Sequence, residues 1–198
     1  MLLEKSRFFV KERARLLKLT DAYDILDPDT QQQVGIAKDE PPGWAKYLRL
    51  LVKKALLPTR INVYDNEAAP PVVSLQKGPG FFRTTVVVTD RTQGTLGRFR
   101  SKFFSLGGGF FVFDDHGQQV AEVKGDWKGW NFKLLDVSGN ELGVVTKKWA
   151  GIGKELFTSA DNYMISLAPA GGGMPAQSRA ALLLAAGLAI DTVFKEKQ

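Results

Sequence analysis

The chain is predicted to fold as a mainly β protein, a closed β-barrel of about twelve strands around a central hydrophobic C-terminal helix. Three observations lead to this prediction. A hairpin pattern repeats along the 198 residues, β-branched and aromatic runs fill the gaps between the hairpins, and one apolar segment lies near the C-terminus. We expect a single domain, 1–198, because all-β single domains often reach this length.

The repeated hairpin pattern consists of an apolar pair, an aspartate, a short polar turn and a second apolar strand. Asp at the first turn position accepts hydrogen bonds from the turn backbone, and Gly supplies the positive φ that closes the turn. Each copy is therefore predicted to be a β-hairpin, without a catalytic or calcium-binding role for its carboxylate. The five aspartates are Asp27, Asp65, Asp90, Asp114 and Asp136.

Further strands are predicted between the hairpins. The run Arg83–Thr89 is β-branched throughout, Phe103–Phe113 indicates two strands around a glycine corner, and Trp127–Leu135 continues the series that Phe8–Arg13 opens. Roughly ten to twelve strands result, which are too many for a small sandwich and enough for a closed barrel.

An inserted amphipathic helix is predicted over about 44–56. Apolar residues recur there at helical spacing, lysine and arginine lie largely on the other side, and no acidic residue occurs between Trp44 and Arg60. Such a basic helix can lie in a membrane interface. Because a buried face is the usual reason for amphipathicity, we expect the apolar face to pack on the barrel.

The core helix is predicted over about 178–194, with an unbroken apolar run from Ala180 to Ile190. A helix of this length spans about 25 Å at 1.5 Å per residue, the short limit for a ~30 Å hydrocarbon core, and Asp191 falls inside it. A helix without a polar face belongs in an apolar surround, and a barrel of about a dozen strands has a lumen to fill. We therefore expect the helix inside the barrel.

Composition limits the classes of function. The absence of cysteine excludes disulfides, thiolate metal sites and cysteine nucleophiles, and His116 as the single histidine excludes a histidine-based triad. We predict no enzymatic activity, no metal site and no cofactor. The net charge of +6 and the isoelectric point of about 9.5 favour anionic partners, either phospholipid headgroups or nucleic acid. On composition alone, an inert basic surface that serves solubility is an equal alternative. The N-terminus lacks the apolar run of a signal peptide, so secretion is not expected.

The hairpin series, the run from Gly143 to Tyr163 and the terminal Ala/Leu helix resemble the phospholipid scramblase and LURP-one-related family. That family is similar to the Tubby C-terminal domain, a twelve-stranded barrel around a central hydrophobic helix. The resemblance covers Phe8 to Glu196 and is most specific in Thr146-Lys-Lys-Trp149, in Lys154-Glu-Leu-Phe157 and in Ala160-Asp-Asn-Tyr163.

Eukaryotic scramblase relatives carry an acidic segment proposed to bind calcium, and its position corresponds to the surroundings of Asp161. Here Ser159 stands where that segment has an acid, and 168–173 supply none. Calcium needs several oxygen ligands, so calcium dependence is not expected. The cysteine-rich N-terminal region and palmitoylation sites of those relatives have no counterpart in this sequence.

The resemblance implies a membrane-peripheral, cytoplasmic protein that binds anionic phospholipids or phosphoinositides on a basic surface, at the inner face of the plasma membrane. Two alternatives remain open: a phospholipid scramblase that moves lipids across the bilayer, and a soluble scaffold or regulator that binds protein or, less favoured, nucleic acid. Arg98, Arg100 and Lys102 alternate on one predicted strand and would share a face. The candidate headgroup-binding residues are Arg98, Arg100, Lys102, Lys128, Lys147, Lys148 and Lys154.

Overall fold

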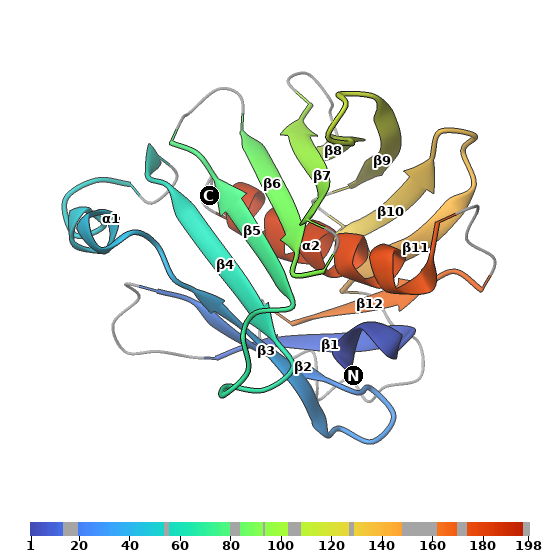
Figure 1. Ribbon diagram of the computed structural model, residues 1–198, viewed down its shortest axis with the longest axis horizontal. Coiled ribbons are helices and arrows are strands. Elements are labelled where there is room, and N and C mark those ends of the chain that lie inside the picture. The colour runs from blue at the N-terminus through green and yellow to red at the C-terminus, as the bar shows by residue number, and fades with distance from the viewer. Residues whose placement is uncertain are drawn as a thin grey trace.

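Twelve strands form one closed antiparallel barrel around the C-terminal helix α2 (Ala176–Lys195), as Figure 1 shows. The predicted fold class is therefore confirmed. The computed structural model describes residues 1–13, 20–53, 56–79, 84–92, 94–102, 108–126, 129–147, 162–169 and 174–195, with only the backbone described for 194 and 195.

The strands follow one another in sequence order around the barrel, and β1 closes it against β12. They are β1 (Arg7–Glu12), β2 (Ala22–Leu26), β3 (Gln33–Asp39), β4 (Thr59–Tyr64), β5 (Val73–Lys77), β6 (Thr85–Asp90), β7 (Gly94–Ser101), β8 (Gly109–Phe113), β9 (Gln119–Asp126), β10 (Asn131–Asp136), β11 (Glu141–Thr146) and β12 (Tyr163–Leu167).

Four of the five hairpin aspartates accept turn hydrogen bonds as the sequence predicts. The acceptor Oδ1 of Asp136, for example, lies 2.8 Å from the backbone nitrogens of both Ser138 and Asn140. Asp27, Asp90 and Asp114 accept in the same way from Asp29 and Thr30, from Thr92 and from Gln118, respectively.

Asp65 is the exception, and the prediction of its turn role is wrong. Its Oδ1 accepts a hydrogen bond of 2.7 Å from the backbone N–H of Leu2, in the short 3-10 helix η1 (Leu2–Glu4) that packs against α2. Asn66 takes over the turn, since its side-chain oxygen accepts from the N–H of Ala68 at 3.1 Å. Leu2 and Asp65 are 63 residues apart in the sequence, so their contact depends on the tertiary structure. The local hairpin pattern carries no information about it.

The helix α2 fills the barrel lumen, and every residue from 180 to 193 is buried. It extends two residues before and one residue beyond the predicted range of 178–194. Gly143 on β11 allows its close approach, because a Cβ at this position would collide with the Leu183 side chain and lie 2.6 Å from the carbonyl oxygen of Ser166. The apolar helix thus provides the core against which the inward-facing strand residues pack.

The antiparallel order gives the barrel two different ends. We call one the turn end, which has the connections 27–32, 65–72, 91–93, 114–118 and 137–140. The other, the loop end, has the connections 13–21, 40–58, 78–84, 102–108, 127–130 and 147–162, two of which are the longest in the barrel. The helix α2 follows the turn-end strand terminus Leu167, and its later residues Ala189 and Thr192 lie beside Thr59 at the loop end.

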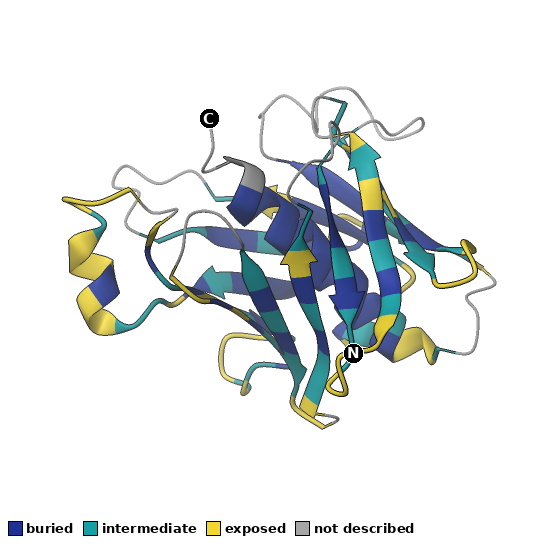
Figure 2. Ribbon diagram, turned by 90° about the horizontal axis from the view of Figure 1, so that it is seen from above, coloured by how far each residue is buried: buried dark blue, intermediate teal, exposed yellow. Residues whose placement is uncertain are grey.

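The inserted helix differs from the prediction in length and in packing. It is α1 (Gly43–Leu48), shorter than 44–56, and it continues into turns. Except for the small Ala45, its apolar side chains do not pack on the barrel: Tyr47 of α1 is 71% exposed, and Leu51 in the turn that follows is 84% exposed. Figure 2 shows α1 projecting from the barrel with mostly exposed residues. Short helices are stable only when an apolar face packs against other elements. The apolar face of α1 makes no such contact, so nothing stabilises further helical turns after Leu48.

Candidate functional site

Arg98 and Arg100 lie on the outer face of β7, as alternate strand residues should. The guanidinium carbon of Arg100 is 4.6 Å from the centre of the Phe113 ring, at cation–π distance. Nη1 of Arg98 donates to the carbonyl oxygen of Asp115 at 3.3 Å. The two side chains therefore form a cationic strip on the barrel wall that is supported by an aromatic ring.

Lys102 follows β7 at the loop end. Its ammonium group forms an ion pair with Glu122 and lies 4.7 Å from the centre of the Phe111 ring, which leaves 11% of the side chain exposed. Its charge is thus compensated by a neighbouring carboxylate. Among Arg98, Arg100 and Lys102, Lys102 is therefore the least suited to bind an external anion.

Lys147 also lies at the loop end, where it follows β11. Its ammonium nitrogen is 4.1 Å from the centre of the Trp130 ring, and its backbone N–H donates to the Trp130 carbonyl oxygen at 3.0 Å. The indole ring itself packs on Tyr163 at a centroid distance of 5.3 Å. A cation on a fixed indole is the combination that suits a boundary between apolar and aqueous phases.

The structure brings the described candidates to two places rather than one. Lys102 and Lys147 are at the loop end, whereas Arg98 and Arg100 lie along the wall of β7, and β8, β9 and β10 separate β7 from β11. Lys128, Lys148 and Lys154 lie outside the described residues.

Two basic residues of the outer wall escaped the sequence prediction. Lys124 on β9 and Lys133 on β10 are exposed and lie directly opposite each other in register. Like charges in this position destabilise a strand pair, although Lys133 also forms an ion pair of 2.8 Å with Glu141. The signal that could have found them is the alternation of polar and apolar residues around each lysine.

The two ends of the barrel carry opposite charge. Among the residues that the structure describes, the loop-end connections contain six Lys or Arg residues and two Asp or Glu residues. The five turn-end connections contain one basic residue, Arg91, and six acidic residues. A separation of positive and negative charge between two ends orients a protein in the electric field of a charged partner. An anion is therefore attracted to the loop end rather than to the turn end.

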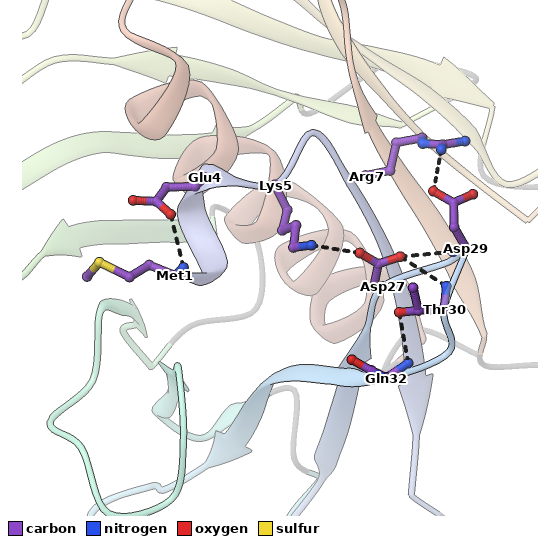
Figure 3. Close-up of polar contacts among 8 residues, drawn as sticks. All are labelled: Met1, Glu4, Lys5, Arg7, Asp27, Asp29, Thr30 and Gln32. Atoms are coloured by element: carbon purple, nitrogen blue, oxygen red, sulfur yellow. Dashed lines mark hydrogen bonds and ion pairs between the residues drawn. The ribbon is translucent and has the colours of Figure 1, made fainter.

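The acids of the turn end are held by local contacts, several of which Figure 3 shows. Nζ of Lys5 donates to Oδ2 of Asp27 at 2.9 Å, and Nη2 of Arg7 donates to Asp29 at 2.5 Å. The hydrogen bond from Lys5, with those from the backbone N–H groups of Asp29 and Thr30, lowers the pKa of Asp27 to about 2. A hydrogen bond from the Asn140 side chain likewise lowers the pKa of Asp136. Both carboxylates are therefore ionised at neutral pH.

A hollow of about 330 Å³ lies beside α1 at the loop end. Its charged lining includes Lys38 and Lys46 and also Asp21, Asp39 and Glu40. Both signs of charge are present, so this hollow is not a simple anion site. Within the described part of the chain, no group of three or more His, Cys, Asp and Glu residues is arranged to hold a metal ion.

The fold and its surface define a class of protein: a closed antiparallel barrel that is filled by an apolar helix and has one basic end. The Scramblase family model matches residues 76–197, from β5 to the C-terminal helix, and the chain belongs to this family. Membership associates the barrel with phospholipid in general, in a family that is generally non-catalytic. No curated protein and no solved structure gives a significant match. Among the helices in the described residues, none has the length and apolar character needed to span a membrane.

Proposed function

We propose that the protein is a peripheral, non-catalytic barrel that binds anionic phospholipid headgroups, phosphoinositides among them, at the cytoplasmic surface of a membrane. The observation that carries this proposal is the charge difference between the loop end and the turn end. Each Lys or Arg near an anionic leaflet contributes about 1 kcal/mol of binding free energy. Four or five loop-end cations therefore suffice for recruitment that salt weakens.

Lys147 and Trp130 support the loop end as the contact surface. The cation offers an ionic partner for a headgroup phosphate, and the ring beneath it belongs to the residue types enriched at membrane–water interfaces. Arg98 and Arg100, farther along the barrel wall, contribute to the long-range attraction rather than to the same headgroup contact.

The central helix favours this function over transbilayer lipid movement by an inserted α2. Residues 180–193 form the core of the barrel, and the hydroxyl of Tyr23 donates a hydrogen bond to Asp191 in the lumen. Withdrawal of α2 would expose the lumen to water and carry the Asp191 carboxylate into hydrocarbon. Lipid movement by this route would therefore require the barrel to unfold.

Flotation of the purified protein with vesicles tests the proposal. Three vesicle types would be compared across a salt series: phosphatidylcholine alone, phosphatidylcholine with phosphatidylserine, and phosphatidylcholine with a phosphoinositide at equal total charge. We expect flotation with the anionic vesicles only and its reversal by salt. A preference for the phosphoinositide at equal charge would identify headgroup recognition. Equal flotation with neutral vesicles, or none with any of them, would contradict the proposal.

A pair of charge reversals tests the orientation. Lys147→Glu at the loop end removes two units of favourable charge and should weaken binding at low salt by about thirtyfold, which corresponds to about 2 kcal/mol. Arg91→Glu makes the same change of net charge at the turn end and should bind nearly as the wild type does. Equal weakening by both variants would exclude an oriented contact through the loop end.

A further inference from the structure

The exposed apolar side chains of this protein are concentrated in one segment. Nine large hydrophobic side chains are exposed among the described residues, and seven of them lie in the stretch from Trp44 to Leu56. The most exposed within α1 and the turn after it are Trp44, Tyr47, Leu50 and Leu51. Scattered exposed apolar residues are normal, but a contiguous group of this kind marks an interaction surface.

An ordinary amphipathic helix packs its apolar face on the core and exposes its polar face. The segment around α1 is oriented the other way round. The side of α1 and its C-cap that faces the barrel carries Ala45 and the guanidinium of Arg49, which is one turn further on. Nη1 of Arg49 lies 2.5 Å from Oδ2 of Asp39, and both side chains are almost completely buried, with 2% and 1% exposed. A second hydrogen bond of 3.2 Å joins Nη2 to the other carboxylate oxygen. A bidentate ion pair thus fixes the polar side to the barrel and turns the apolar side chains outward.

The segment is also basic and lies at the basic end of the barrel. Its exposed Lys46 and Lys53 flank the apolar residues, and the sequence contains no acidic residue from 41 to 64. Amphipathic segments with Trp, Tyr and Leu beside lysine bind the interfacial region of anionic membranes, where the apolar groups enter to a depth of about 5–10 Å. The lysines and the exposed apolar side chains of the segment are therefore both suited to an anionic membrane.

We propose that residues 43–53, which we call the apolar tip, insert their exposed side chains into the interfacial region of an anionic membrane while the Arg49–Asp39 ion pair holds the tip to the barrel. This inference deepens the proposed function and rests on it. The basic loop end attracts the membrane over a distance, and the apolar tip adds a contact that salt does not screen.

Charge favours a membrane over a second copy of the chain. A symmetric contact between two tips would bring Lys46 and Lys53 of one copy close to the same residues of the other, and like charges in an interface oppose association. An anionic leaflet instead pairs with these lysines while it receives the leucines.

Site-specific labelling tests the insertion directly. The chain has no cysteine, so Leu51→Cys provides a single attachment point for an environment-sensitive fluorophore. Val137, an apolar residue at the turn end that is 69% exposed, provides the matched control position. On phosphatidylserine-containing vesicles, we expect a blue shift and quenching by brominated acyl chains at position 51 and neither effect at position 137. The same weak response at both positions would overturn the proposal.

Paired substitutions test the contribution to affinity. Leu50→Ser with Leu51→Ser should weaken binding to anionic vesicles on the order of tenfold or more, and the loss should persist at high salt. Val137→Ser should bind as the wild type does. Since all three side chains are exposed, the melting temperatures should remain unchanged, and a tip variant that melts normally and binds normally would refute insertion.

The outcomes separate this inference from the proposed function. If the wild type binds no vesicle, the proposed function fails together with the insertion. If Lys147→Glu weakens binding while the serine variant does not, the proposed function holds and the insertion fails. Light scattering over a protein concentration series tests the alternative that a second copy of the chain covers the apolar tip. A dimer that the serine variant abolishes would assign the tip to self-association and overturn the proposal.

Discussion

The Tyr23 hydroxyl donates a hydrogen bond of 2.6 Å to Oδ2 of Asp191 inside the barrel, and this contact joins β2 to the central helix across 168 residues of sequence. Both side chains are 1% exposed. Burial raises the pKa of Tyr23 well above its ordinary value, and the Asp191 carboxylate adds to the rise. The helix is therefore held by a specific polar contact as well as by its apolar surface.

Removal of this hydroxyl should destabilise the protein. Tyr23→Phe removes a hydrogen bond to a buried carboxylate, so we expect the free energy of unfolding to fall by about 1–3 kcal/mol. Urea unfolding of Tyr23→Phe, Asp191→Asn and the double variant would measure the coupling between the two side chains. Strictly additive effects would show that the two groups do not interact.

Alkaline conditions should weaken the fold through its tyrosines. Burial raises the pKa of Tyr163 well above its ordinary value, and burial together with the Glu40 contact raises the pKa of Tyr64 to about 12. An unfolded tyrosine titrates near 10. Because the folded pKa values are the higher ones, the stability that they represent is complete below about pH 10 and declines as pH rises towards 12 and beyond. Tyrosinate absorbance from Tyr23, Tyr64 and Tyr163 should therefore appear with unfolding, and titration of these three tyrosines near pH 10 in folded protein would contradict this.

The elements that the sequence predicts well are those specified by local patterns. Alternation and the aspartate turns locate most strands, and the unbroken apolar run of α2 identifies a core helix because no polar face is available for water. The apolar positions near Trp44 also show helical spacing, yet there the prediction of packing was wrong. Spacing indicates which residues share a face and does not indicate whether that face meets the core.

The candidate binding surface was less predictable because it depends on contacts between distant strands. The cation–π contact of Lys147 with Trp130 joins two connections, and the pairing of Lys102 with Glu122 depends on the register of β7, β8 and β9. Neither contact follows from spacing along one strand. The charge of each end, in contrast, follows from the sequence once the strand order is known.

The buried Arg49–Asp39 pair should be important for stability. Arg49→Met removes the guanidinium from the almost completely buried Asp39 carboxylate, and breaking such a pair costs about 3–5 kcal/mol. Urea unfolding would measure this loss, and Lys46→Met, an exposed substitution on the same short helix, is the matched control with an expected change within about 0.5 kcal/mol. Similar stability of the two variants would show that the ion pair does not anchor α1.

Asp27 should make the turn end sensitive to acid. Its pKa is lowered to about 2, first by the hydrogen bond from Lys5 and then by turn N–H groups, whereas an unfolded aspartate titrates near 3.9. A lowered folded pKa gives stability that is present above about pH 4 and lost as pH falls towards 2. Asp27→Asn should lower the melting temperature at neutral pH and flatten its decline between about pH 4 and 2, relative to Asp115→Asn at an exposed turn position. If the melting temperature of Asp27→Asn declined with falling pH as that of the wild type does, Asp27 would not be the source of the acid sensitivity.

Because α2 fills the barrel, substitutions of Leu184 should strongly affect folding. Leu184 lies in the middle of the helix and is 0% exposed. Leu184→Ala should leave a cavity in the barrel and reduce the free energy of unfolding by about 2–5 kcal/mol. Leu184→Asp should prevent folding, because an unpaired carboxylate would lie among apolar side chains with no compensating charge. Gln177→Ala, at the exposed start of the same helix, is the control and should melt near the wild type. Circular dichroism and urea unfolding of the three variants measure these effects, and normal folding of Leu184→Asp would mean that α2 does not occupy the lumen in solution.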